Sequence, residues 1–278
     1  MVAIALGLGA ALSWGLADFV GGLKSRSLAV LLVLLVSQGA GLVLITAIVA
    51  AGVGSPPGAG ALAAAAASAC AGLVGLAAFY RGLAIGAMAV VAPISATAAV
   101  IPVTFGIATG ERPSLVQGAG VAIALTGVVL ASREPPHGEA AARRAKGVGL
   151  ALLAAVAFGS FFVLIDSASE QDAAWAIFAN RVTAVSVLLL IATALRPGLP
   201  KPADLLPLAA IGLLDIGANG LFVLSAAEGL VSVAAVLASL YPVVVILLAR
   251  AVLKERVSRL QGAGALVALA GVVLISAG

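Results

Sequence analysis

The chain has 278 residues, of which 63% are hydrophobic and 9% are charged, and its mean hydropathy is +1.25. A soluble domain of this length does not need so much apolar surface, so the composition excludes a soluble protein and predicts that lipid surrounds most of the chain. The net charge is +4, but the cations are scattered between apolar runs, which argues against a nucleic-acid partner and for orientation in a membrane.

Ten apolar stretches are long enough to cross a bilayer as helices, because a spanning helix needs roughly 20 apolar residues. The stretches show no alternation of polar and apolar residues, which argues against a transmembrane β-barrel. The predicted fold class is an all-α integral membrane protein with ten transmembrane helices. The expected spans are residues 2–23, 28–51, 60–80, 86–109, 114–132, 147–166, 172–195, 203–225, 231–253 and 259–277.

The second half of the chain repeats the first. Residues Glu111–Ser132 match Glu255–Ser276 at 14 of 22 positions without a gap, at a shift of 144. We expect a first five-helix repeat over residues 1–132, a linker over 133–146 and a second repeat over 147–278. Because each repeat has an odd number of spans, the second is predicted to be inverted relative to the first. Inverted repeats are typical of secondary transporters, whose sites lie where the two halves meet.

Helix starts and loop charges support this division. Ser114 and Gln117 form a predicted capping box, which recurs at Ser258 and Gln261. The acidic residues that precede these boxes, Glu111 and Glu255, are interpreted as charges favoured at helix starts.

Odd-numbered loops hold 13 Lys and Arg residues, whereas even-numbered loops hold Arg112 alone. The positive-inside rule then places the odd loops in the cytoplasm and both termini outside, for a multi-pass protein of the cell membrane.

Recognisable catalytic and metal-binding motifs are missing from the sequence. There is no phosphate-binding loop, and the single histidine, His137, lies in the predicted linker, which excludes a His-based triad and the H-E-x-x-H zinc motif. The single cysteine, Cys70, lies in an alanine-rich span. We therefore expect no catalytic residues, no metal and no cofactor.

Two acidic residues and one arginine lie inside the predicted spans. An ionisable side chain in the hydrocarbon core is energetically unfavourable, so each of these residues is expected to have a partner or a function. Asp18 follows Trp14 by one helical turn, so both lie on one face of the first span. Trp14 would then line a substrate cavity while Asp18 binds a proton or a cation. Alternatively, Asp18 pairs with Lys24 or Arg26 and anchors the end of the helix.

Arg181 lies deep within the seventh span, where a guanidinium needs a carboxylate, carbonyls or water. Asp215 in the eighth span, followed one turn later by Asn219, is one candidate partner, and Asp166 is another. Arg181 is either half of a structural ion pair or the binding site for an anionic group of the substrate.

Spans four and nine contain prolines, at Pro93 and Pro102 and at Pro242. Because proline lacks a backbone donor and frees a carbonyl, we expect both spans to be kinked. Ser95 and Ser239 are equivalent positions of the two repeats. The kinks are either binding or hinge points or purely structural.

These motifs resemble the drug/metabolite transporter superfamily, specifically its EamA type, along essentially the whole chain. The residues that carry the resemblance are Trp14-Gly15, then Val91-Ala92-Pro93-Ile94-Ser95 through Gly110-Glu111-Arg112 to Gln117-Gly118, then Leu240-Tyr241-Pro242 through Glu255-Arg256 to Gln261-Gly262 and Gly271. The resemblance implies a ten-helix inverted repeat around a central cavity, and transport of small metabolites such as amino acids. It also implies these candidate cavity residues: Trp14, Tyr80, Ser95, Asn219, Ser239 and Tyr241. Such proteins are usually drawn with cytoplasmic termini, whereas the charges of this chain indicate the reverse.

The sequence thus predicts a secondary transporter that moves a small organic solute, amino-acid-like or drug-like, by alternating access. Its partners are that solute and membrane lipid, with Asp18 as proton carrier and Arg181 as counter-charge. Two other hypotheses remain. An intramembrane lipid-modifying enzyme would use Asp18, Asp166 or Asp215 as acid or base, and a non-transporting membrane subunit would show no solute flux alone.

Overall fold

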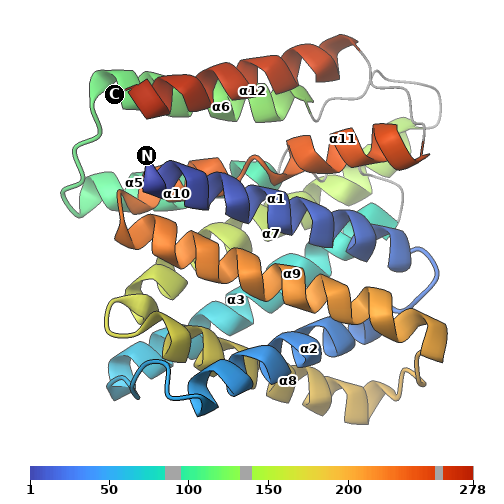
Figure 1. Ribbon diagram of the computed structural model, residues 1–278. Helices are drawn as coiled ribbons and strands as arrows, with labels where there is room; N and C mark the ends of the chain where they lie inside the picture. The colour runs from blue at the N-terminus through green and yellow to red at the C-terminus, as the bar shows by residue number, and fades with distance from the viewer. Residues whose placement is uncertain (85–94, 132–139, 254–258, 278) are drawn as a thin grey trace.

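The computed structural model describes residues 1–84, 95–131, 140–253 and 259–277, and every regular element within these ranges is a helix (Figure 1). The all-helical prediction is confirmed for this part of the chain. The elements are α1 (Val2–Lys24), α2 (Val30–Ala50), α3 (Ala59–Ala84), η1 (Thr97–Ala99), α5 (Val100–Ala108), α6 (Leu115–Ala131), α7 (Ala140–Ser169), α8 (Ala173–Leu195), α9 (Pro202–Ala227), α10 (Val231–Ala238), α11 (Tyr241–Leu253) and α12 (Arg259–Ala277).

Six of the described helices are long and apolar enough to cross a bilayer, namely α1, α2, α3, α7, α8 and α9. They cover six of the ten predicted spans. The first part of the predicted fourth span lies outside the described residues, and its remainder forms η1 and α5. Shorter apolar helices cover the fifth span and part of the ninth.

The predicted ninth span is not one helix. It divides into α10 and α11, with Ser239 and Leu240 between them. Pro242 lies in the first turn of α11, where the missing proline N–H costs no helical hydrogen bond. Where a kink was expected at this proline, the helix is instead interrupted at Ser239 and Leu240, just before it.

The helix α7 begins at Ala140, so its first residues fall inside the predicted linker of residues 133–146. The segment from 140 to 146 reads AAARRAK, and alanine, arginine and lysine are among the best helix formers. Helix propensity accounts for a helix that begins about two turns before the expected span of residues 147–166.

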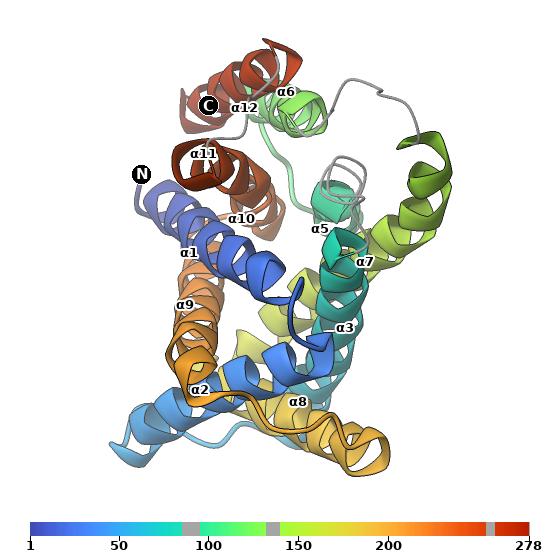
Figure 2. The same ribbon diagram turned by 90° about the vertical axis from the view of Figure 1, so that its right-hand side faces the viewer.

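The helices run roughly side by side, and both chain termini lie at the same end of the bundle (Figure 1). We call this the terminal end; it also holds the connections α2–α3, α5–α6, α7–α8 and α9–α10. The opposite end, here called the far end, holds the connections α1–α2 and α8–α9. Viewed along the helices, α6 and α12 lie together at one edge of the molecule (Figure 2).

Helix packing follows the sequence repeat. α3 packs on α7, and the equivalent helices α9 and α1 pack on each other; α2 packs on α9, and the equivalent helices α8 and α3 do the same. α6 packs on its own equivalent, α12. Every contact named here thus has a counterpart under the shift of 144.

In the contact between α6 and α12, individual residue contacts are also equivalent under the shift of 144. A Cβ added to Gly127 would collide with the backbone of Ala268, and one added to Gly271 would collide with the backbone of Ala124. Gly271 and Ala268 are the equivalents of Gly127 and Ala124 at the same shift. Small residues allow such close approach where lipid provides no hydrophobic drive for helices to associate.

Candidate functional site

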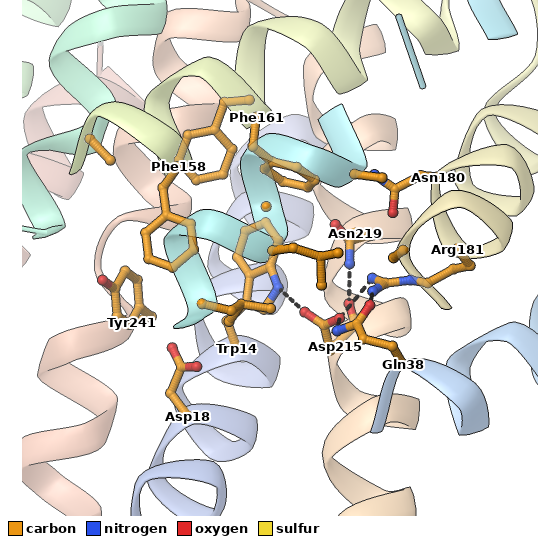
Figure 3. Close-up of a pocket in the computed structure, with 17 residues that line it drawn as sticks. Trp14, Asp18, Gln38, Phe158, Phe161, Asn180, Arg181, Asp215, Asn219 and Tyr241 are labelled. Carbon is orange, nitrogen blue, oxygen red and sulfur yellow. Dashed lines mark hydrogen bonds and ion pairs between the residues drawn. The ribbon is translucent and has the colours of Figure 1, made fainter. Parts of the chain in front are cut away.

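A cavity lies between the two halves of the chain; the space free of atoms within it is about 660 Å³, part of which is open to solvent. Its lining comes from α1, α2, α3 and η1 of the first half and from α7, α8, α9 and α11 of the second. The lining residues are Trp14, Asp18, Gln38, Ala69, Gly72, Leu73, Leu76, Ala98, Phe158, Phe161, Phe162, Asn180, Arg181, Ala184, Asp215, Asn219 and Tyr241 (Figure 3).

Asp215 of α9 is the centre of the polar side of this cavity (Figure 3). Its Oδ1 accepts a hydrogen bond from Trp14 Nε1 at 2.9 Å, and its Oδ2 lies 2.7 Å from Arg181 Nη2 and 3.4 Å from Gln38 Nε2. Asn219 Nδ2 donates to the Asp215 backbone carbonyl at 2.7 Å. One carboxylate therefore joins α1 and α2 of the first half to α8 and α9 of the second.

Arg181 forms its ion pair with Asp215, one of the two carboxylates that the sequence offered. Its Nη1 also donates to Gln38 Oε1, and its Nε is buried without a hydrogen-bond partner among the described residues. The other candidate, Asp166, lies near the end of α7, where Glu170 and Glu111 interact with it electrostatically. Arg181 lines the cavity although the residue is only 4% exposed, and a buried donor without an acceptor is energetically unfavourable.

Asp18 lines the same cavity, one turn along α1 from Trp14. It is 8% exposed, and the Tyr80 hydroxyl donates to its Oδ1 at 3.3 Å. Lys24, one of its two expected anchoring partners, instead forms an ion pair of 2.7 Å with Asp204 of α9. The charged groups that line the cavity are the carboxylates of Asp18 and Asp215 and the guanidinium of Arg181. The two carboxylates are close enough to interact electrostatically.

Three of the expected cavity residues lie behind the lining. Tyr80 supports Asp18, and the Ser95 hydroxyl lies 3.1 Å from the hydroxyl of Tyr241, which does line the cavity. Ser239 donates to the Ala235 carbonyl of its own helix, at the break between α10 and α11. The remaining expected residues, Trp14, Asp18, Arg181, Asp215, Asn219 and Tyr241, all line the cavity.

Aromatic rings bound the cavity in two groups. Trp14 packs on Phe161, Phe162 and Phe222 with centroid separations of 5.7–6.5 Å. Phe79 packs on Tyr80, Phe158 and Tyr241, each with a centroid separation of 6.0 Å. The rings that line the cavity itself are those of Trp14, Phe158, Phe161, Phe162 and Tyr241, and the other rings pack against these.

Two polar lining residues, Gln38 and Asn180, were missed by the sequence analysis. Gln38 bridges Arg181 and Asp215, and Asn180 Nδ2 donates to Ser68 Oγ at 2.8 Å. The signal for Gln38 was its polarity inside an otherwise apolar span. The signal for Phe158, also missed, was its equivalence to Trp14 in the repeat.

Comparison with known proteins agrees with the helical repeat. The model of the EamA-like transporter family matches the chain twice, over residues 1–133 and 145–277. The chain is similar in fold to a solved structure described as "Crystal structure of protein", with a TM-score of 0.77 and 19% sequence identity. The match covers 98% of this chain and 95% of that one.

No curated protein sequence matches the chain. The family model, in contrast, covers nearly its whole length, once in each half. The chain is a multi-pass membrane protein and belongs to the EamA-like transporter family.

Proposed function

We propose that this protein is a secondary transporter that moves a small organic solute through the central cavity by alternating access. The observation that carries the proposal is the polar cluster around Asp215. Side chains of both halves converge on one carboxylate at the wall of the cavity. A rearrangement of the halves must therefore break or remake bonds at the place where a solute would bind, which couples binding to movement.

The solute would carry an anionic group and an apolar body. Arg181 Nε has no acceptor among the residues that the structure describes, and a carboxylate is the acceptor that matches a guanidinium best. Trp14, Phe158 and Phe161 supply the apolar wall. This chemistry fits the amino-acid-like or drug-like solutes expected from the family resemblance.

Asp18 would bind the coupling proton or a cationic group of the solute. It faces the cavity, while the guanidinium of Arg181 is already paired with Asp215. Neither of the two ion pairs found among the described residues includes Asp18. Because an intramembrane carboxylate that lacks a cation is energetically unfavourable, its neutralisation by a proton or by the solute would favour occupancy.

We infer that ten spans form two inverted five-helix repeats, and that the protein resides in the cell membrane with both termini outside. α3 packs on α7, and their equivalents under the shift of 144, α9 and α1, also pack on each other, which supports the symmetry. The concentration of Lys and Arg in the odd loops supports the orientation. Under this proposal residues 1–132 and 147–278 are the repeats.

The test is a thermal-shift screen of the purified protein against a metabolite library, followed by flux measurements in liposomes with each stabilising compound. A bound solute raises the unfolding temperature because it stabilises only the folded state. Arg181→Ala should lose both the shift and the flux, whereas Arg112→Ala, an exposed arginine, should keep both. Full flux by the Arg181→Ala variant would eliminate the proposed role of this residue.

A further inference from the structure

Glu111 reaches across the boundary between the two halves at the terminal end. It lies in the connection between α5 and α6 of the first half. Its Oε1 accepts a hydrogen bond from the backbone N–H of Val231 at 3.0 Å, and its Oε2 accepts one from the hydroxyl of Ser232 at 2.5 Å. Val231 and Ser232 are the first two residues of α10, in the second half. Glu111 is thus bound to the start of a helix other than its own.

The start of α10 needs this contact. The residue before the helix, Leu230, provides no side-chain cap, so the first N–H groups depend on other acceptors. A carboxylate is a strong acceptor at that position because its hydrogen bonds are charge-assisted and its charge complements the helix dipole. Gly106 makes room for it, since a Cβ there would collide with the Glu111 carboxylate.

Two neighbouring contacts also join the halves at the terminal end. Asp172 Oδ2 accepts from the Ser55 N–H at 2.9 Å, and Gln171 Oε1 accepts from the Gly58 N–H at 2.8 Å. At the far end, the halves are joined by the Lys24–Asp204 ion pair. The contacts of Glu111 therefore join the two halves at the terminal end and not at the far end.

We propose that Glu111 is a positioning residue for transport, acting as a latch that caps α10 across the boundary and favours the state closed at the terminal end. The inference rests on the proposed alternating-access function. When the terminal end opens, α10 separates from the α5–α6 connection and loses its cap. The carboxylate therefore sets how often that end opens, without touching the solute.

The experiment measures the opening of each end separately with single cysteines in a Cys70→Ser background. Ala168→Cys reports the terminal end, because Ala168 is fully buried near the end of α7 in the same apolar cluster as Val231. Ala78→Cys reports the far end, because Ala78 is 4% exposed and lies toward the end of α3 opposite the α2–α3 connection. The purified full chain in detergent is labelled with a maleimide, and the labelling rates are compared.

Glu111→Ala should raise the labelling rate of the Ala168→Cys reporter about 5- to 30-fold, the factor expected for loss of a helix cap. The Ala78→Cys reporter should not become faster. Glu111→Gln keeps an acceptor oxygen but loses the charge, so its effect should be intermediate. Glu170→Gln removes an exposed charge at the same end, and Asp204→Asn breaks the far-end ion pair; neither should accelerate the Ala168→Cys reporter.

An unchanged rate at Ala168→Cys, or an equal rise at both reporters, would overturn the latch, because the second result indicates general loosening. If Glu111→Ala does not fold, the Glu111→Gln comparison decides. Flux in liposomes separates this inference from the proposed function. Selective labelling without flux of any stabilising solute would refute transport alone, whereas flux with unchanged labelling would refute the latch alone.

Discussion

The guanidinium of Arg181 in α8 lies 2.7 Å from the carboxylate of Asp215 in α9. The two residues are 4% and 8% exposed. Removing both charges from water has a large desolvation penalty. The attraction between the charges offsets this penalty only with good geometry and additional hydrogen bonds. Gln38 and Trp14 of the first half provide those bonds, so the pair depends on both halves of the chain.

Arg181→Ala should destabilise the fold by about 3–5 kcal/mol, because it leaves the Asp215 carboxylate buried and unpaired. The double variant Arg181→Met/Asp215→Leu should recover most of this loss, since an apolar pair of similar volume is often neutral. Denaturant unfolding of the purified proteins in detergent measures both values. Arg112→Ala, at an exposed arginine, should change stability by less than about 0.5 kcal/mol. A double variant no more stable than the single one would contradict this explanation.

Tyr80→Phe should lower stability by about 1–3 kcal/mol, since a buried carboxylate loses the donor that Tyr80 provides to Asp18. Tyr241→Phe is the matched control, because it removes a hydroxyl that interacts with the neutral Ser95 and should cost about 0.5–1.5 kcal/mol. The loss at Tyr80 should shrink when Asp18→Asn is already present, which a double-mutant cycle measures. Equal losses in the two backgrounds would show that Tyr80 acts through packing alone.

Asp18→Asn should abolish accumulation of solute driven by a pH gradient while leaving exchange of solute across the membrane intact. Asparagine has nearly the shape of aspartate but cannot carry a proton between the two sides. Uptake into liposomes with and without an imposed pH gradient separates these two activities. Glu170→Gln, an exposed carboxyl-to-amide change, should keep both. Gradient-driven accumulation by the Asp18→Asn variant would exclude Asp18 as the proton carrier.

Gly127→Ala and Gly271→Ala should each destabilise the protein by about 1–3 kcal/mol, because the new methyl group would collide with backbone of the partner helix. The two losses should be similar, since the contacts are equivalent under the repeat. Gly118→Ala has open space around its Cβ and should gain up to about 1 kcal/mol from helix propensity. Thermal unfolding of the three variants checks the order. Destabilisation at only one of the two glycines would contradict the symmetric packing.

Much of the fold could be predicted because its signals are local or repeated. Span length and the shift of 144 can be read from the chain, and the capping box of Ser114 and Gln117 forms as expected. Its repeat at Ser258 and Gln261, and the acidic residue Glu255, include positions outside the described residues.

The parts that escaped prediction depend on tertiary contacts. The sequence offered Asp215 as one of two candidate partners of Arg181, but the role of Gln38 required the position of α2 against α8 and α9. Glu111 was interpreted as a charge at the start of its own helix, whereas it caps α10, 120 residues later in the chain. The local sequence does not indicate whether the Glu111 side chain binds the start of α6 or the start of α10.

The most direct test of the account is the sidedness of two equivalent positions, Ser27 and Gln171, which are related by the shift of 144 and both exposed. Single cysteines at these sites, in a Cys70→Ser background, are labelled in sealed cells and in inverted vesicles with a membrane-impermeant maleimide. Inverted repeats place the two sites on opposite sides of the membrane, so we expect Gln171→Cys to react in cells and Ser27→Cys only in inverted vesicles. Labelling of both from the same side would contradict inverted halves and, with them, a transport site at their boundary.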